Sequence, residues 1–273
     1  MKTAVVGVGM VGGALARYLP EPILYDKFKE IGSLDEVNSA DIVFVAVPTP
    51  YDEEKGGFDL DAVEETLGNI EGEKIVVIKS TVVPGTTEAL QEKYPNHKIL
   101  FNPEFLTEET ADQDMRFPDR QIVGYTARSY SAAGDLMQLL PLAPFERIMP
   151  ATEAEMVKYF GNTWFAMKVV FAEQMFDLCH ALGVDYNRIK EAAASDKRIG
   201  RSHLTACHDG YRGYGGKCLP KDTKALIQRA RSLGVEMSLL EKVDEINAIL
   251  NQLPPIDDSV READETFNNN AKS

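Results

Sequence analysis

Hydrophobic residues in the first 150 positions come in short, nearly continuous runs separated by amphipathic stretches. Runs rich in Val and Ile are typical of strands covered on both faces, and their alternation with helical patterns predicts βα units. We therefore predict an α/β fold with a parallel sheet. The expected strands are Thr3–Val8, Ile23–Tyr25, Ile42–Val47, Ile75–Lys79, Ile99–Phe101, Gln121–Val123 and Glu146–Met149. The expected helices are Val11–Leu19, Asp59–Asn69, Thr86–Glu92 and Arg128–Leu139.

From Thr152 onward the pattern changes to long helices without a strand signal. Thr152 and Glu155 have the spacing of a capping box, which predicts a helix start, and apolar residues recur at helical period to about Leu182. Further helices are expected at Tyr186–Ala194, Pro220–Leu233 and Ser238–Leu253. We divide the chain into an α/β domain over 1–150, an all-helical domain over 151–253 and a polar, disordered tail over 254–273.

Composition limits the classes of function. The 273 residues suit two domains, and the net charge of −14 argues against a nucleic-acid or anionic-membrane surface. No apolar run has the roughly 20 residues that a membrane helix needs, and the N-terminus lacks a signal-peptide pattern, so we expect a cytoplasmic protein. The three cysteines form neither a disulfide framework nor a CxxC pair, and no metal site is predicted.

A glycine motif follows the first expected strand and opens a helix. In the run Gly7, Val8, Gly9, Met10, Val11 and Gly12, the three glycines allow a tight turn, close approach of a pyrophosphate, and close helix packing. Asp26 ends the second strand, where a carboxylate can hold the adenosine ribose hydroxyls and favours NAD. The neighbouring Lys27 and Lys29 keep NADP as an alternative. The motif predicts a Rossmann-type nucleotide site.

Residues 27–40 leave little room between Asp26 and the strand that begins near Ile42. One short helix such as Leu34–Asn38 fits, but a helix, a third strand and a crossover do not. We therefore expect an abridged Rossmann-type sheet.

The sharpest chemical signal is the segment Gly213–Asp222, in which three glycines precede Cys218. Pro220 suits the first turn of a helix, so Cys218 is expected at a helix N-terminus flanked by lysines, where a thiolate is stabilised. Such a cysteine is suited to covalent catalysis at an aldehyde. A buried cysteine beside a glycine turn is the simpler alternative.

An ordered set of motifs resembles the UDP-glucose/GDP-mannose dehydrogenase family. Besides the cysteine segment, the resemblance rests on Val6–Gly13, Ala40–Pro50, Lys79–Glu88, Phe101–Glu109, Phe117–Gly124, Lys158 with Asn162, and Asp196–Gly200. The resemblance implies two oxidations of a sugar 6-hydroxyl with NAD, a nucleotide-sugar substrate and a homodimer built on the long helix. UDP-glucose is the expected substrate.

Site roles are carried over from the resemblance, position by position. Cys218 would capture the aldehyde, Lys158 and Asn162 would stabilise oxyanion charge, and Thr81 and Asp222 with Lys158 would hold a water. Glu104 or Glu108 would serve thioester hydrolysis, and the two are not ranked. The remaining cofactor residues are Val47, Pro48, Thr49, Ser80, Thr81 and Glu108. The substrate residues are Glu104, Phe105, Leu106, Lys158, Asn162, Arg198, Arg212, Tyr214, Gly215 and Lys221.

Each of these residues also has a simpler explanation. Lys158 is explained equally by a solvated charge on a helix. Glu104 and Glu108 are explained by an interaction with a helix dipole, and Thr81 by an ordinary hydroxyl at the end of a strand. Residues 197–224 carry seven basic residues against two acidic ones, which suits either a phosphorylated ligand or a solvated face.

The chain departs from the family after about Leu253, where typical members continue into a third, nucleotide-binding domain. We hypothesise that Arg212 and Tyr211 compensate by holding phosphate or base, or that a separately encoded partner supplies the missing domain. Two other functions stay open: a hydroxy-acid dehydrogenase of the 6-phosphogluconate/3-hydroxyisobutyrate type, and a non-catalytic NAD-binding module.

Overall fold

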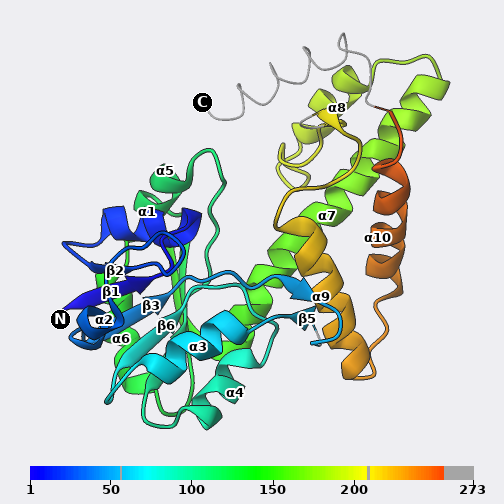
Figure 1. Ribbon diagram of the computed structural model, residues 1–273. Coiled ribbons are helices and arrows are strands. Elements are labelled where there is room, and N and C mark those ends of the chain that lie inside the picture. The colour runs from blue at the N-terminus through cyan, green and yellow to red at the C-terminus, as the bar shows by residue number, and fades with distance from the viewer. Residues whose placement is uncertain (56, 208–209, 255–273) are drawn as a thin grey trace. The chain divides into compact units, whose positions relative to one another are not determined.

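The computed structural model describes residues 1–55, 57–207 and 210–254 (Figure 1). The chain forms two compact units, the first comprising Met1–Tyr159 and the second beginning at Phe160. Nearly all of the predicted tail, from residue 255 onward, lies outside the described residues.

Unit 1 is built on a seven-stranded sheet with the order β2-β1-β3-β6-β7-β8-β9. All neighbours in this sheet are parallel except β7 and β8. Its strands are β1 (Thr3–Val6), β2 (Ile23–Tyr25), β3 (Ile42–Val45), β6 (Ile75–Ile78), β7 (Lys98–Phe101), β8 (Arg120–Tyr125) and β9 (Phe145–Pro150). Its helices are α1 (Met10–Tyr18), α2 (Leu34–Asn38), α3 (Asp61–Asn69), α4 (Thr86–Lys93), α5 (Ala111–Arg116) and α6 (Tyr130–Leu139).

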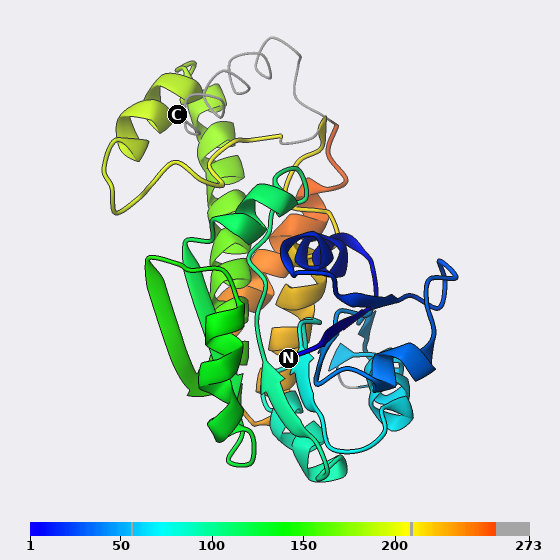
Figure 2. The same cartoon turned by 90° about the vertical axis from the view of Figure 1, so that its left-hand side faces the viewer.

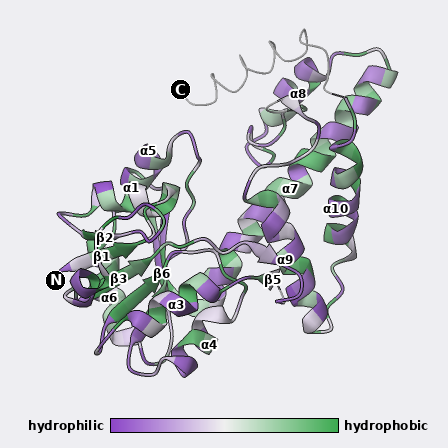
Figure 3. Ribbon diagram, viewed as in Figure 1, coloured by the Kyte–Doolittle hydropathy of each residue, from purple (hydrophilic) through white to green (hydrophobic). Residues whose placement is uncertain are grey.

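Successive strand residues point to opposite faces of the sheet, so the apolar strands supply two cores. Val43 and Val45 of β3 belong to one core, to which α2, α3 and α4 contribute, whereas Ile42 and Phe44 belong to the other, with α1, α5 and α6. Figure 3 shows the hydrophobic strands in green, and Figure 2 shows helices on either side of the sheet. Burial on both faces explains why these strands lack polar alternation.

The abridged sheet is confirmed. A single short helix, α2, connects β2 to β3, and β2 is the edge strand beside β1. Helix α2 has a capping box that sequence analysis did not identify, formed by Ser33 and Glu36.

The prediction of an all-parallel sheet is wrong at one pair, because β7 and β8 are antiparallel. A parallel neighbour requires a crossover to the opposite end of the sheet. Residues 102–119 make no such crossover, and β8 therefore runs back beside β7. The two-residue strands β4 (Tyr51–Asp52) and β5 (Gly57–Phe58), which pair in a separate sheet, and helix α5 were too short to be predicted.

The long helix α7 (Ala151–Ala181) ends unit 1 and begins unit 2. The capping-box interpretation of its start is wrong, because the Glu155 carboxylate bonds to α4 instead of to Thr152. Its oxygens accept hydrogen bonds from the backbone N–H of Gly85 at 2.6 Å and of Thr87 at 2.8 Å. Spacing along the chain could not distinguish a local cap from this tertiary contact.

Unit 2 is helical, as predicted. Beyond α7 it contains α8 (Tyr186–Ala194), α9 (Leu219–Ser232) and α10 (Ser238–Leu250). One core joins α7 and α10 through Val170 and Val243, and the ring of Tyr214 is buried in it. Helices α9 and α10 lie side by side (Figure 1).

Candidate active site

The glycine turn between β1 and α1 has the geometry of a nucleotide site. Gly7 has a φ of +88°, and a Cβ on Gly12 would lie 1.8 Å from the carbonyl oxygen of Gly7. Gly7 is therefore required for its left-handed backbone conformation, and Gly12 for the close approach of the Gly7 carbonyl oxygen. A Cβ on Gly9 would meet nothing within 4 Å, so open space remains beside the N-cap of α1. The turn thus fits a pyrophosphate at a helix N-terminus.

The side chain of Asp26 is bonded to backbone N–H groups of this glycine turn and of the residues that follow β2. Its carboxylate accepts hydrogen bonds from the N–H groups of Val8 at 2.8 Å, Phe28 at 3.0 Å and Lys29 at 3.1 Å. Partial burial opposes ionisation of Asp26, but these N–H groups together hold its pKa below the ordinary value. The ionised carboxylate would hold ribose hydroxyls and repel a 2′-phosphate.

The two neighbouring lysines differ in their contacts. Lys27 pairs with Glu65 at 2.7 Å. The Nζ of Lys29 donates to the carbonyl oxygen of Val8, within the glycine turn, at 2.6 Å, so one lysine charge lies beside the nucleotide turn.

The other predicted cofactor loops follow β3 and β6, which are adjacent parallel strands. The hydroxyl of Thr49 donates to the carbonyl oxygen of Thr81 at 2.7 Å. The hydroxyl of Ser80 donates to the carbonyl oxygen of Val47, also at 2.7 Å. The two loops are thus fixed against each other at the carboxyl ends of the strands, where α/β sheets bind nucleotides. Thr81 is partly exposed.

Lys158 and Glu104 form a buried ion pair in unit 1. The Lys158 ammonium donates to the Glu104 carboxylate at 2.6 Å and to the Glu104 carbonyl oxygen at 2.9 Å. Burial alone would raise the pKa of Glu104, but the charge and hydrogen bond of Lys158 hold it below the ordinary value. Lys158 is 6% exposed, which excludes the solvated-charge explanation. Glu108 is exposed, so the contacts favour Glu104 as the ionised base.

Sequence analysis missed two polar residues beside this pair. Lys79 is buried, and its ammonium donates to the Asn102 side chain at 2.7 Å. Burial lowers the pKa of Lys79 to about 8, with Lys158 adding to the shift and Glu104 opposing it. Both residues directly follow a buried strand, β6 or β7, and a polar residue at that position was the available signal.

In unit 2, Cys218 is the N-cap of α9 and is exposed, whereas Cys179 and Cys207 are buried. Helix α9 begins at Leu219, one residue earlier than predicted, and Pro220 lies in its first turn. The structure thus excludes the alternative of a buried cysteine at position 218.

Asp222 lies one turn into α9 and is wholly buried. Its carboxylate accepts hydrogen bonds from the Asn162 amide at 2.5 Å and from the Lys221 ammonium at 2.6 Å. The structure therefore brings Asn162, Lys221 and Asp222 together near the start of α9.

The basic segment is less positive than its composition indicates. Arg198 pairs with Asp196 at 2.6 Å, and Lys221 pairs with Asp222. Arg212 is buried and pairs with Glu173 and Asp177. These contacts favour a structural role for Arg212 over the predicted phosphate contact.

Two further predicted substrate residues contact other residues of unit 2. Tyr214 is 2% exposed, and its backbone N–H donates to the Asn247 side chain at 2.7 Å. A Cβ on Gly215 would lie 2.8 Å from the ring of Tyr211, so Tyr211 covers this glycine.

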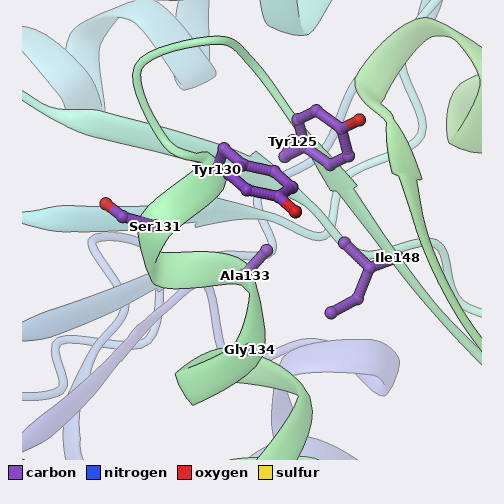
Figure 4. Close-up of a pocket in the computed structure, with 6 residues that line it drawn as sticks. All are labelled: Tyr125, Tyr130, Ser131, Ala133, Gly134 and Ile148. Carbon is purple, nitrogen blue, oxygen red and sulfur yellow. The ribbon is translucent and has the colours of Figure 1, made fainter.

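A hollow in unit 1 lies among β8, α6 and β9 (Figure 4). It is lined by Tyr125, Tyr130, Ser131, Ala133, Gly134 and Ile148, none of which was predicted to be functional. Within the part of the chain that the structure describes, no cluster of His, Cys, Asp and Glu could hold a metal ion. None of the described helices combines the length and the apolar character of a membrane span.

Two models of the UDP-glucose/GDP-mannose dehydrogenase family match the chain: the NAD binding domain over residues 25–138 and the central domain over residues 152–249. The solved structure of a UDP-glucose dehydrogenase from the hyperthermophilic archaeon Pyrobaculum islandicum is 32% identical. It matches 91% of this chain and 68% of its own, with a TM-score of 0.78. The chain belongs to this family. Unit 1 contains the family's NAD-binding domain, and NAD is the cofactor.

Curated relatives agree with this assignment. The UDP-glucose 6-dehydrogenase of Pseudomonas aeruginosa is 39% identical over 235 residues, which cover 78% of this chain and 50% of the relative. UDP-glucose 6-dehydrogenase AglM of Haloferax volcanii is 35% identical over 245 residues, covering 81% and 55%. The chain thus spans about half the length of the curated relatives it matches.

Proposed function

We propose that this family member oxidises the 6-hydroxyl of a nucleotide sugar, UDP-glucose first among the candidates, to the carboxylate. Two molecules of NAD⁺, bound one after the other, would each accept one hydride in the two oxidations. The observation that carries the proposal is the start of α9, where an exposed Cys218 lies one turn from the buried Asn162–Asp222 hydrogen bond. An aldehyde oxidation through a thioester requires such a nucleophile, whereas a single alcohol oxidation does not.

In the proposed sequence, the first oxidation removes a hydride from C6 and the hydroxyl proton, and leaves an aldehyde. The Cys218 sulfur then bonds to C6, and the carbonyl oxygen becomes the hydroxyl of a thiohemiacetal. Loss of a second hydride from C6 and of the hydroxyl proton gives a thioester. Attack by water breaks the C–S bond, and the products are the carboxylate and the cysteine thiol.

The proposed roles of the other residues are carried over from the family resemblance, and their contacts are compatible with them. Lys158 is a charged donor and Asn162 is an amide donor, and both types of donor can stabilise the oxyanion during each addition. Glu104 is ionised and is proposed as the base that activates the hydrolytic water. Thr81 and Asp222 are proposed to hold the water of the first proton transfer.

For the substrate we keep Phe105, Leu106, Arg198, Gly215 and Lys221 from the family resemblance. Arg212 and Tyr214 are omitted because their contacts within unit 2 account for them.

Counting NADH per sugar tests the proposal. The pure protein is incubated with NAD⁺ and with UDP-glucose, GDP-mannose or a small hydroxy acid, and the product is identified. Two NADH per sugar, lost in Cys218→Ser, are expected. One NADH per hydroxy acid, with Cys218→Ser still active, would establish the hydroxy-acid dehydrogenase alternative. NAD binding without turnover on any substrate would favour the non-catalytic module.

We also propose that the chain is a homodimer through α7. Phe160 and Phe171 on this helix are 74% and 61% exposed, and Trp164 and Leu178 are exposed on it as well. These four residues recur at helical spacing, which is typical of a helix face that is covered in an assembly. A monomeric mass by light scattering at micromolar concentration would contradict this proposal.

A further inference from the structure

Glu173 on α7 holds two distant points of the segment that leads to Cys218. It is wholly buried, and its Oε1 accepts the backbone N–H of Cys207 at 2.9 Å and that of Gly213 at 2.9 Å. Its Oε2 accepts the side-chain Nε–H of Arg212. One carboxylate therefore fixes both ends of the segment from Cys207 to Gly213.

The backbone at Cys207 has an unusual conformation. Cys207 has a φ of +57°, which is uncommon for a residue with a side chain and persists only where the surroundings impose it. The second arm of Arg212 donates to Asp177 at 2.8 Å, and its guanidinium lies 5.6 Å from the centre of the Phe176 ring. The contacts of Glu173 and Arg212 thus impose this shape from α7.

A second anchor holds the next residue, Tyr214. The Asn247 side chain of α10 accepts the N–H of Tyr214 at 2.7 Å and donates to the carbonyl oxygen of Tyr214 at 3.0 Å. A Cβ on Gly213 would lie 2.4 Å from the Asn247 oxygen, so only glycine allows this approach. The Tyr214 ring and the Leu219 side chain both pack in the core of unit 2.

Cys218 lies between these fixed points. Only residues 215–218 separate the anchored Tyr214 from Leu219, the first residue of α9. A tether this short gives the exposed thiol little freedom, so its location at the start of α9 depends on where Gly213 and Tyr214 are held.

We propose that Glu173 is a positioning residue for Cys218, acting through its two hydrogen bonds to the backbone of Cys207 and Gly213. The proposal rests on the proposed role of Cys218 as the nucleophile. Arg212 neutralises the buried carboxylate, and the acceptor Oε1, not the charge, positions the loop.

The test separates the acceptor from the charge with two matched variants. Glu173→Gln with Arg212→Met keeps a carbonyl oxygen for the two N–H groups and removes both charges. Glu173→Leu with Arg212→Met is equally uncharged but has no acceptor. Glu153→Gln, which removes an exposed carboxylate at the start of α7, is the control outside the loop contacts. The measurement is the rate of alkylation by iodoacetamide at Cys218, whose thiol is exposed while Cys179 and Cys207 are buried.

We expect the Gln variant to be alkylated at close to the wild-type rate. The Leu variant should be slower by about fivefold or more, because it loses two hydrogen bonds of about 1 kcal/mol each that hold the thiol at the helix N-terminus, where its thiolate is stabilised. Its kcat should fall while its KM for NAD is unchanged, because the NAD-binding domain is in unit 1. Equal alkylation rates and equal kcat in the two variants would overturn the proposal, even if the Leu variant is less stable.

If the Leu variant does not fold, Glu173→Asp decides. It keeps the negative charge that pairs with Arg212, but its shorter side chain withdraws the oxygen from the two backbone N–H groups, so alkylation should slow. A wild-type rate in Glu173→Asp would overturn the proposal. Alkylation needs no turnover, so this result stands apart from the NADH count that tests the proposed function.

Discussion

Each unit contains a buried pair of a glutamate and a basic residue, and the two pairs differ in what else the carboxylate binds. Glu104 accepts the Lys158 ammonium on one oxygen and one backbone N–H, that of Leu106, on the other. Glu173 accepts two backbone N–H groups on one oxygen and Arg212 on the other. The first pair lies among residues that follow sheet strands, and the second spans a loop.

The two basic residues differ in how many carboxylates they contact, and this distinguishes a pair suited to catalysis from a structural pair. Among the described residues, the Lys158 ammonium donates hydrogen bonds to Glu104 alone, so we expect its charge to act on a developing oxyanion. Arg212 divides its guanidinium between Glu173 and Asp177, and both carboxylates reduce its capacity to bind a phosphate. A basic residue shared by two acids in one unit is better explained by loop structure.

The largest effect is expected from Lys158→Met. Loss of the ammonium removes oxyanion stabilisation, and kcat should fall by about 10²–10³-fold. Steady-state kinetics of NADH formation would measure this. The matched control is Lys168→Met, which removes a lysine elsewhere on α7 and should change kcat little. A fall of similar size in both variants would show that Lys158 has no special role.

Arg212→Met should mainly affect stability. The substitution leaves the charge of Glu173 buried without its Arg212 partner, which should lower the free energy of unfolding by about 3 kcal/mol. Urea denaturation would measure the change in the free energy of unfolding, and the KM for the nucleotide sugar should be unchanged. A KM raised by about tenfold with normal stability would support the phosphate contact predicted from the sequence.

Glu155 extends the comparison, because it is a buried carboxylate that pairs with no cation among the residues that the structure describes. Its hydrogen bonds come from Gly85 and Thr87, yet burial outweighs them and raises its pKa to about 7. The folded state then holds a proton that the unfolded state releases above its ordinary pKa. Stability should therefore fall by roughly 3 kcal/mol as the pH rises from about 4.5 to 7.

Denaturation of the wild type and of Glu155→Gln at several pH values tests this. The amide does not ionise, so the difference in stability between the two proteins should change over that range in favour of Glu155→Gln. Parallel pH dependences would contradict the prediction.

The smallest effect is expected from Lys27→Ala, which removes an exposed pair with Glu65. Exposed pairs are well solvated and contribute little to stability. The urea midpoint and the KM for NAD should both be unchanged. A clear loss of NAD affinity would show that Lys27 contacts the cofactor.

Local patterns predicted much of the fold and the cofactor end. The Val- and Ile-rich runs located the main strands, and the short spacing after Asp26 predicted the abridged sheet. The exposed Cys218 at the start of α9 also followed from the glycines and Pro220 around it. These features depend on residues that are close in the chain, where backbone sterics and helix caps act directly.

Long-range partners were not predictable in this way. Lys79 and Asn102 come from two strands, and nothing in their spacing shows that their side chains meet at 2.7 Å. Glu155 matched a local capping motif but bonds to α4, some 70 positions away. A charged side chain can satisfy itself with whichever donor the fold brings close, so its partner depends on the packing of whole elements.

Sequence patterns predicted the main strands and helices, the glycine turn at Gly7–Gly12 and the cysteine at a helix start, because each is encoded in adjacent residues. Only the tertiary structure decided which charges are buried and with what. It paired Lys158 with Glu104, and it paired Arg212 with Glu173 and Asp177. The cost of burying a charge is met by contacts that are distant in sequence, and these exist only after folding.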